Sequence, residues 1–212
     1  MAFTGWRPEA FDVLGQLEGD PPSSLREELR PDREALVRVP MIELLDDLGE
    51  RDPSYADHAV WHYGKMVWFW QHQSATIRID RNIEIGVGLS FDGLRLQGAW
   101  WYGAADQRER FRAAVAGRPG ARLQRIVDDL RALGYEIGGD RMKRVPKGYP
   151  ADHRRADLLR HRSLTAVCEL GFEDWLFTAE ALDRVEQVAT ELRPMLEWLS
   201  DHVVADAELA AP

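Results

Sequence analysis

Cysteine and long apolar runs are scarce in this sequence. Cys168 is the only cysteine, so an intrachain disulfide is excluded, which agrees with a reducing compartment. No stretch approaches the roughly 18 uninterrupted apolar residues that a membrane-spanning helix requires. The first 20 residues lack the basic start and apolar stretch of a secretory signal. We therefore expect a cytoplasmic protein that contacts no membrane.

Positive charge is also in the minority. The 27 Lys and Arg residues face 36 Asp and Glu residues, giving a formal net charge of −9. Binding to a polyanion requires a continuous basic face that releases counterions, so we expect no nucleic-acid partner. A local basic patch could still take one phosphate or carboxylate.

The 212 residues are enough for one large core. We find no internal repeat and no linker long enough to separate two domains. The sequence predicts a single domain over residues 1–203, followed by a flexible tail over residues 204–212.

Apolar residues recur at helical spacing near the start of the chain and again through much of its second half. This spacing predicts helices over about 8–18, 106–116, 121–133 and 179–203. A further helical run from Ser24 to Gly49 must be interrupted at Pro31 and Pro40, because a proline inside a helix removes a backbone hydrogen bond and clashes with the preceding turn.

The apolar period changes from 3.6 to 2 over residues 57–102. Met66, Trp68 and Trp70 alternate with their neighbours, and residues 77–79, 83–89 and 94–96 follow the same pattern. The turns between these segments are short, and short turns join only antiparallel neighbours. The sequence therefore predicts an α+β fold, in which an antiparallel meander sheet over about 57–102, with a late strand near 164–170, packs against several helices.

Positive charge concentrates in residues 141–162, which we call the basic segment. It holds eight Lys or Arg residues against two acids. Such a concentration costs self-repulsion unless it has a partner. Pro146, Gly148 and Pro150 predict a stiff loop that leads into a short helix over about 152–161, whose N-terminus would favour an anion. The residues predicted to bind a ligand are Lys143, Lys147, Tyr149, His153, Arg154 and Arg160.

Two other interpretations of the basic segment stay open. The cations could form a solvated face, or they could pair with the acidic closing helix or with Asp46 and Asp47.

His153, Asp157 and His161 recur at intervals of four residues. On one helix the outer two would lie roughly 12 Å apart, too far for one ion, so we expect no metal site, and nothing in the sequence indicates a cofactor. Asp157 could instead hydrogen-bond one imidazole and fix its tautomer. His153, with Asp157, is therefore the candidate general acid or base.

The tryptophans of the predicted sheet support two interpretations. They could form core, or one face could line an aromatic pocket, because adjacent Trp100 and Trp101 point to opposite faces of an extended strand. The residues proposed for such a pocket wall are His62, Trp68, Trp70, His72 and Trp100.

The run from Lys143 to His153, KRVPKGYPADH, followed by Asp157-Leu158-Leu159-Arg160, resembles the most recognisable motif of DUF2461, a bacterial family of conserved hypothetical proteins. The opening Phe3-Thr4-Gly5-Trp6 and the late Trp198-Leu199 are similar to that family's ends. The resemblance implies a single α+β domain in the bacterial cytoplasm and supplies no established activity.

The middle of the chain departs from the family's pattern. Such proteins usually carry a basic Arg-Asp-x-Arg-Phe-Ser segment there, whereas this chain reads Trp68-Phe69-Trp70-Gln71-His72. If the family's basic middle segment cooperates with the Lys-Gly-Tyr motif, this chain lacks half of that site.

Three hypotheses about function remain. The favoured one is a binding protein that receives a small anionic ligand, or an acidic partner segment, at the surface formed by residues 147–160. The second is an enzyme that acts on an acidic small molecule, with His153 as general acid or base. The third is a structural homodimer formed through the Trp-rich sheet.

Overall fold

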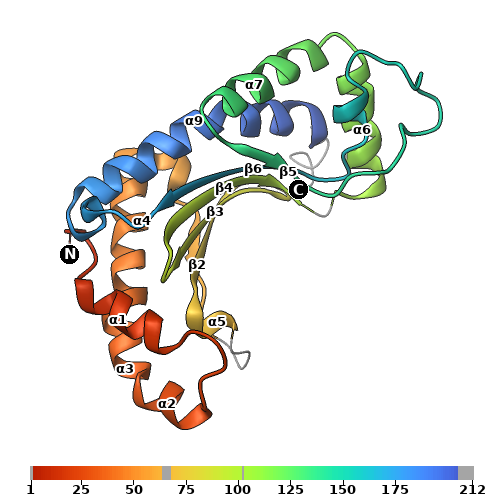
Figure 1. Ribbon diagram of the computed structural model, residues 1–212. Coiled ribbons are helices and arrows are strands. Elements are labelled where there is room, and N and C mark those ends of the chain that lie inside the picture. The colour runs from red at the N-terminus through yellow and green to blue at the C-terminus, as the bar shows by residue number, and fades with distance from the viewer. Residues whose placement is uncertain (1, 64–67, 102, 205–212) are drawn as a thin grey trace, which may run out of the picture. The chain divides into compact units, whose positions relative to one another are not determined.

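The computed structural model of the protein describes residues 2–63, 68–101 and 103–204 (Figure 1). Its α-helices are α1 (Pro8–Gln16), α2 (Ser23–Glu28), α3 (Arg30–Arg33), α4 (Val39–Arg51), α5 (Trp68–Gln71), α6 (Ala105–Ala116), α7 (Gly120–Ala132), α8 (Ala156–Leu159) and α9 (Glu180–Val203). Its strands are β1 (His58–Val60), β2 (Gln73–Asp80), β3 (Ile83–Ser90), β4 (Gly93–Trp100), β5 (Glu136–Gly138) and β6 (Leu164–Gly171). A π-helical turn, Glu34–Arg38, joins α3 to α4, and Pro53–Tyr55 and Asp174–Phe177 are short 3₁₀ turns.

These strands of the described residues form one antiparallel sheet in the order β1-β2-β3-β4-β6-β5. Two-residue turns join β2 to β3 and β3 to β4, and the backbone of Asn82 and Gly93 at these turns is left-handed, as tight hairpins require. The α+β fold with an antiparallel meander is therefore confirmed. The late strand is β6, and the structure adds β5 as its partner at the edge.

The chain groups into two compact units. Unit 1 comprises Met1–Arg78, Ile85–Leu96 and Glu169–Ala189, and unit 2 comprises Ile79–Glu84, Gln97–Cys168 and Thr190–Pro212. A single domain over residues 1–203 stays a prediction. Most of the predicted tail, residues 205–212, lies outside the described residues.

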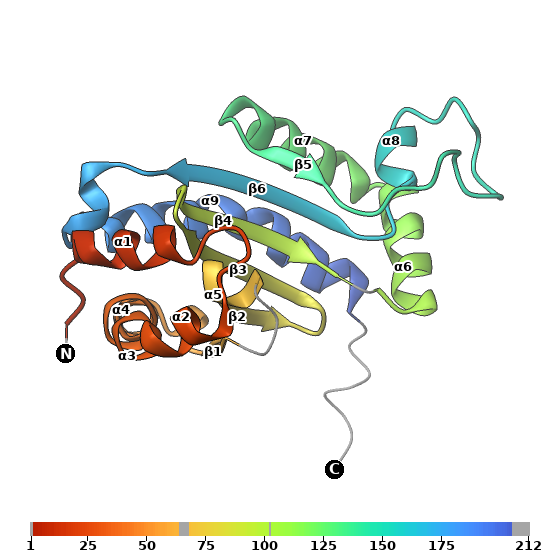
Figure 2. The same cartoon turned by 60° about the horizontal axis from the view of Figure 1, so that its bottom comes forward.

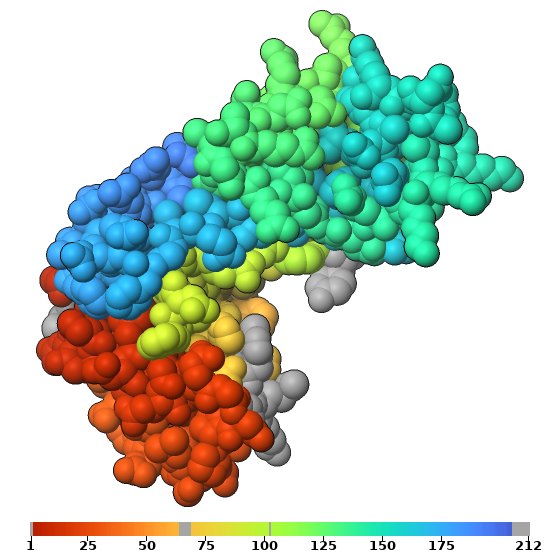
Figure 3. All heavy atoms as spheres, viewed as in Figure 1, coloured from red at the N-terminus to blue at the C-terminus, as the bar shows by residue number. Residues whose placement is uncertain are grey.

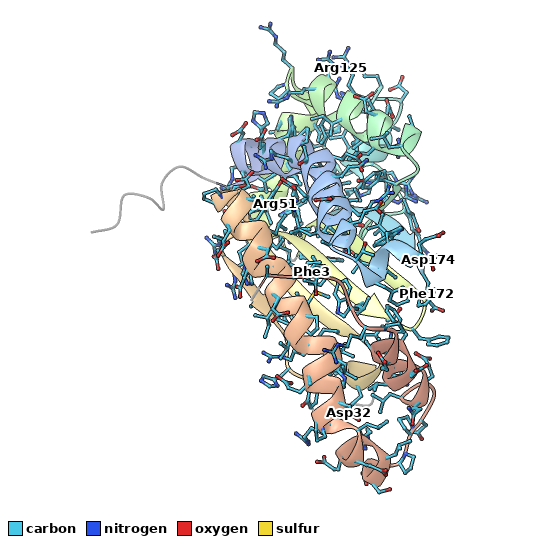
Figure 4. All side chains as sticks on the ribbon, turned by 90° about the vertical axis from the view of Figure 1, so that its left-hand side faces the viewer. Phe3, Asp32, Arg51, Arg125, Phe172 and Asp174 are labelled. Atoms are coloured by element: carbon cyan, nitrogen blue, oxygen red, sulfur yellow. The ribbon has the colours of Figure 1, made fainter. Side chains whose placement is uncertain are left out.

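Unit 1 contains the helical run that the prolines interrupt. Pro31 is the second residue of α3 and Pro40 the second residue of α4, with the π-helical turn between the two helices, so the predicted break is confirmed. Arg51, labelled in Figure 4, lies at the other end of α4. Its Nη1 lies 2.7 Å from Oδ1 of Asp183 and 2.6 Å from Oε2 of Glu186 in α9. These exposed ion pairs join the two helices within unit 1.

Residues 68–71 form a helix, α5, and the prediction of a strand there was wrong. A buried cation 36 to 39 residues earlier in the chain stabilises the helix instead. Arg33, which is fully buried, donates hydrogen bonds to the carbonyl oxygens of Phe69, Trp70 and His72 at 2.9 Å each. A positive group is most stable at the C-terminal end of a helix, where carbonyls lack intrahelical partners.

Burial lowers the pKa of Arg33 to about 10, which leaves the guanidinium charged at neutral pH. Its face also stacks on Tyr63, with 4.5 Å between the guanidinium carbon and the ring centroid. Trp70 packs beside it against Val13, Leu17 and Leu29.

The core of unit 2 is aromatic. The ring centroids of Trp100 and Phe111 lie 4.9 Å apart, and those of Phe111 and Trp198 lie 6.1 Å apart. Nε1 of Trp198 donates to the carbonyl of Pro119 at 3.2 Å, and the hydroxyl of Tyr135 donates to Glu191 at 2.6 Å. These contacts fix α6, α7 and the second half of α9 around one core.

No helix within the described residues combines the length and the apolar character needed to cross a membrane.

Candidate functional site

The basic segment lies in unit 2 and connects β5 to β6. Figure 2 shows its loop leading into α8, which lies beside α6. The two ends of the segment are tied together, because Arg141 pairs with His161 in an antiparallel bridge and the amide of Met142 donates to the carbonyl of Arg160 at 2.8 Å. The segment is therefore a closed loop that begins and ends at the sheet.

Three of its eight cations are paired with other groups of the protein. Arg155, only 3% exposed, donates to the last carbonyls of α6 at Val115, Ala116 and Gly117. Arg160 donates to the carbonyl of Met142 at 2.8 Å and pairs with Asp157 at 3.3 Å. Arg162 pairs with Asp140 at 2.8 Å.

The other five cations are exposed. Within residues 2–63, 68–101 and 103–204, no carboxylate lies within 4.0 Å of the charged groups of Arg141, Lys143, Arg144, Lys147 or Arg154. Pairing of the segment with Asp46 and Asp47, which belong to unit 1, stays an open interpretation. Like charges that lack a partner raise the local positive potential.

A pocket with a volume of about 280 Å³ opens beside this charge. It is lined by α7 and the C-terminal half of the basic segment, which lie next to each other in Figure 3 (green and teal). The lining residues are Gln124, Arg131, His153, Arg154, Arg155, Ala156, Asp157, Leu158 and His161. The pocket lies entirely within unit 2.

His161 is the most deeply buried titratable group of this pocket. Its side chain is 2% exposed, and its Nδ1 lies 2.9 Å from the carbonyl oxygen of Ser163. Because a carbonyl only accepts, Nδ1 carries the proton and Nε2 holds the free lone pair. Burial lowers the pKa of His161, and the nearby cations Arg141 and Arg131 act in the same direction, whereas the hydrogen bond to Ser163 and Asp157 oppose it.

His153 has the opposite tautomer. Its Nδ1 accepts a hydrogen bond from the backbone amide of Arg155 at 3.1 Å, so the proton of the neutral ring is on Nε2. Among the described residues, no hydrogen bond joins Asp157 to either imidazole. The tautomers are fixed instead by the carbonyl of Ser163 for His161 and by the amide of Arg155 for His153.

Asp128 orients the side chains that α7 contributes. Its Oδ1 accepts from Nε2 of Gln124 at 3.0 Å and from Nη1 of Arg131 at 3.2 Å. Gln124 and Arg131 were missed by sequence reasoning, because nothing local to α7 marks them. His161 was within the regular spacing of His153 and Asp157, which was the signal that could have found it.

The predicted ligand residues divide into two groups. His153 and Arg154 line the pocket, together with Asp157. Lys143, Lys147, Tyr149 and Arg160 do not line it: the two lysines are exposed on the loop, and the amide of Tyr149 closes a turn onto the carbonyl of Pro146 at 3.3 Å.

The predicted helix over residues 152–161 is only α8, four residues long. The amides ahead of it are already paired, because Ala156 donates to the carbonyl of His153 and Arg155 donates to the imidazole of the same residue. An anion at this helix N-terminus stays a prediction, and a helix of this length supports it less than the longer helix that the sequence predicted. The burial of the Arg155 side chain against α6 requires a turn where the sequence predicted the first helical turn.

The residues of the proposed aromatic wall belong to different units, and the wall stays a prediction. Trp70 is buried in the core of unit 1, and Trp100 is buried in the core of unit 2. His62 is exposed, with its ring 5.8 Å from that of Tyr63, and the carbonyl of His72 accepts from Arg33. The side chain of Trp68 lies outside the described residues.

Within the described residues, no three or more His, Cys, Asp and Glu side chains are grouped so that they could hold a metal ion.

Comparison with known families gives one finding for this chain. A family model described as "Conserved hypothetical protein (DUF2461)" matches residues 63–198, which is more than half of the chain. The match includes the KRVPKGYPADH run and also the middle region that departs from the family's usual pattern, whereas the similar opening at Phe3–Trp6 lies outside it. A comparison with curated proteins finds no match.

Proposed function

The chain belongs to the DUF2461 family of conserved hypothetical proteins, a description that names no activity, and from the geometry we propose that it binds a small anionic ligand in the pocket of unit 2. The observation that carries this proposal is the coincidence of a pocket with cations that no described carboxylate neutralises. Chief among these is Arg154, which lines the pocket and is exposed.

Arg131 is the second cation of the site. Its Nη1 faces Asp128, so the remaining N–H groups of its guanidinium are available to a ligand. A guanidinium binds carboxylate and phosphate through paired hydrogen bonds that are stronger than those between neutral groups. Two arginines from different elements, one on α7 and one on the basic segment, would hold an anion from two sides. Nε2 of His153 adds a neutral donor.

The exposed cations of the loop have a supporting role in this proposal. Arg141, Lys143, Arg144 and Lys147 lie outside the pocket lining and lack a described carboxylate partner. They raise the local concentration of anions without contacting the ligand. Such an effect is long-range and is screened over a Debye length of about 8 Å at physiological ionic strength.

The proposal is tested with inorganic phosphate as the probe, by isothermal titration calorimetry and by the shift in melting temperature. Phosphate should raise the melting temperature of the wild-type protein, because a ligand that binds only the folded state stabilises it by mass action. The double variant Arg131→Gln, Arg154→Gln should lose this shift. Arg125→Gln is the matched control, since Arg125 is exposed on the same helix and does not line the pocket.

Phosphate binding that persists in the double variant, or that is lost equally in Arg125→Gln, would overturn the pocket as the site. An acidic peptide that binds the wild type and is lost only in a Lys143→Gln, Lys147→Gln variant would instead place the partner on the loop. Absence of binding by phosphate, sulfate and acetate would end the proposal.

A further inference from the structure

The pocket contains hydrogen-bond acceptors as well as cations. Nε2 of Gln124 is committed to Asp128 at 3.0 Å, so Oε1 is the atom of that amide left to accept. Asp157 contributes a carboxylate, of which Oδ1 lies 3.3 Å from Arg160 and Oδ2 has no such contact among the described residues. Both residues line the pocket.

His161 supplies a third acceptor. Its Nδ1 proton is held by the carbonyl of Ser163, so Nε2 is the remaining polar atom of this pocket-lining ring. In the neutral ring that nitrogen only accepts. The lowered pKa of His161 favours the neutral form and so preserves this acceptor.

A sulfate or a simple carboxylate offers these acceptors nothing, because it has no donor at neutral pH. Asp157 would also repel it. A hydroxyl group on the same molecule resolves the mismatch, since it donates to an acceptor while the anionic group faces Arg131 and Arg154. Resting on the proposed function, we infer that the ligand of this pocket is a small hydroxylated anion, such as a sugar phosphate or a hydroxycarboxylate.

The size of the pocket agrees with this class. Its volume of about 280 Å³ is near the lower end of the roughly 300–1,000 Å³ typical of small-molecule sites. A monosaccharide phosphate or a sugar acid is of suitable size, whereas a dinucleotide cofactor is too large. Sites that hydrogen-bond a substrate hydroxyl discriminate strongly against analogues that lack it, because their polar groups are then left unpaired.

Calorimetric titration with five probes tests the inference: ribose 5-phosphate, gluconate, sulfate, acetate and ribose. At least one of the two hydroxylated anions should bind about tenfold or more tightly than the matching simple anion, and ribose alone should bind more weakly than either. The tighter of ribose 5-phosphate and gluconate identifies the anionic group. Equal affinities for hydroxylated and simple anions would overturn the inference and leave the proposed function standing.

A pair of variants separates the hydroxyl contacts from the anion contacts. Gln124→Met removes an acceptor at nearly constant volume, and Asp157→Ala removes the carboxylate at the exposed side. Together they should abolish the tenfold preference for the hydroxylated anion, while sulfate binds as well as or better than in the wild type because a negative charge has been removed. Asp152→Ala is the control, since Asp152 is an exposed acid of the same segment outside the pocket.

The two proposals fail in different ways. A preference that survives the Gln124→Met, Asp157→Ala variant shows that the hydroxyls bind elsewhere and refutes the inference alone. Loss of all anion binding in the wild type refutes the proposed function and the inference with it.

Discussion

Nη2 of Arg155 donates a 2.7 Å hydrogen bond to the carbonyl oxygen of Gly117, 38 residues earlier in the chain. The same nitrogen reaches Ala116 at 2.9 Å, and Nε reaches Val115. The most buried cation of the basic segment therefore stabilises the negative end of α6 and is not available to a ligand. Its neighbour Arg154 is exposed and lines the pocket.

This pair of adjacent arginines gives the first prediction. Arg155→Met should lower the free energy of unfolding by about 2–4 kcal/mol, because three carbonyls at the end of α6 lose a charged donor. Arg154→Met should change it by less than about 0.5 kcal/mol, as surface substitutions do. Urea unfolding followed by circular dichroism measures both. Similar losses in the two variants would contradict the assignment of Arg155 as structural and Arg154 as free.

Arg33 gives a second prediction, in unit 1. Arg33→Met should cost about 2–4 kcal/mol, because the carbonyls of Phe69, Trp70 and His72 would be left without their buried donor. Arg30→Met removes an exposed ion pair with Glu27 and contacts with the Tyr63 and Trp70 rings, and should cost clearly less than Arg33→Met. Thermal unfolding monitored by tryptophan fluorescence distinguishes the two. A loss for Arg30→Met as large as that for Arg33→Met would show that burial does not set the cost.

His161 gives a prediction about pH. Its pKa in the folded protein is below the usual value of 6.5, so between these two values the unfolded chain binds more protons than the folded protein. The free energy of unfolding should therefore fall as the pH is lowered through 6.5 towards the folded-state pKa, with a slope of at most about 1.4 kcal/mol per pH unit from this group.

The variant His161→Asn isolates that contribution, since its side-chain amide can still donate to Ser163. The difference in unfolding free energy between wild type and variant should shrink on acidification from pH 7 to pH 5. An NMR titration of the His161 ring gives an independent value. A folded-state pKa at or above 6.5, or a difference that does not change with pH, would refute the prediction.

Two glycines of the same loop region separate steric clash from backbone strain. Both Gly139 and Gly148 have left-handed backbone, with φ of 111° and 97°. A Cβ at Gly139 would clash with the carbonyl oxygen of Ser163, whereas one at Gly148 would meet nothing within 4 Å. Gly148→Ala should therefore cost about 1 kcal/mol and Gly139→Ala clearly more. Equal melting temperatures for the two variants would show that the backbone around Gly139 shifts at no cost to remove the clash.

The local sequence pattern predicted an element correctly where the element's own apolar residues form its buried face. The period-2 segments at 77–79, 83–89 and 94–96 became β2, β3 and β4, and Pro31 and Pro40 interrupted the long helical run as expected. The alternation failed as a strand signal at Trp68 and Trp70, because Arg33, far away in the sequence, stabilises the end of a helix there. Met66 lies outside the described residues.

The residues of the candidate site likewise divide into those that the sequence pattern identified and those that only the structure revealed. The charge and the spacing of residues 141–162 identified His153, Arg154 and Asp157, all of which line one pocket. Gln124 and Arg131 reach that pocket from α7, and their orientation depends on Asp128.

The sequence by itself determined that positive charge gathers in one segment, that the fold combines a meander sheet with helices, and which family the chain belongs to, because charge, apolar period and motif are properties of neighbouring residues. Only the tertiary structure decided which of the eight cations stay free, because groups from other elements either bind a cation or leave it exposed. The carbonyls at the end of α6 bind Arg155, Asp140 pairs with Arg162, and no described carboxylate pairs with Arg154.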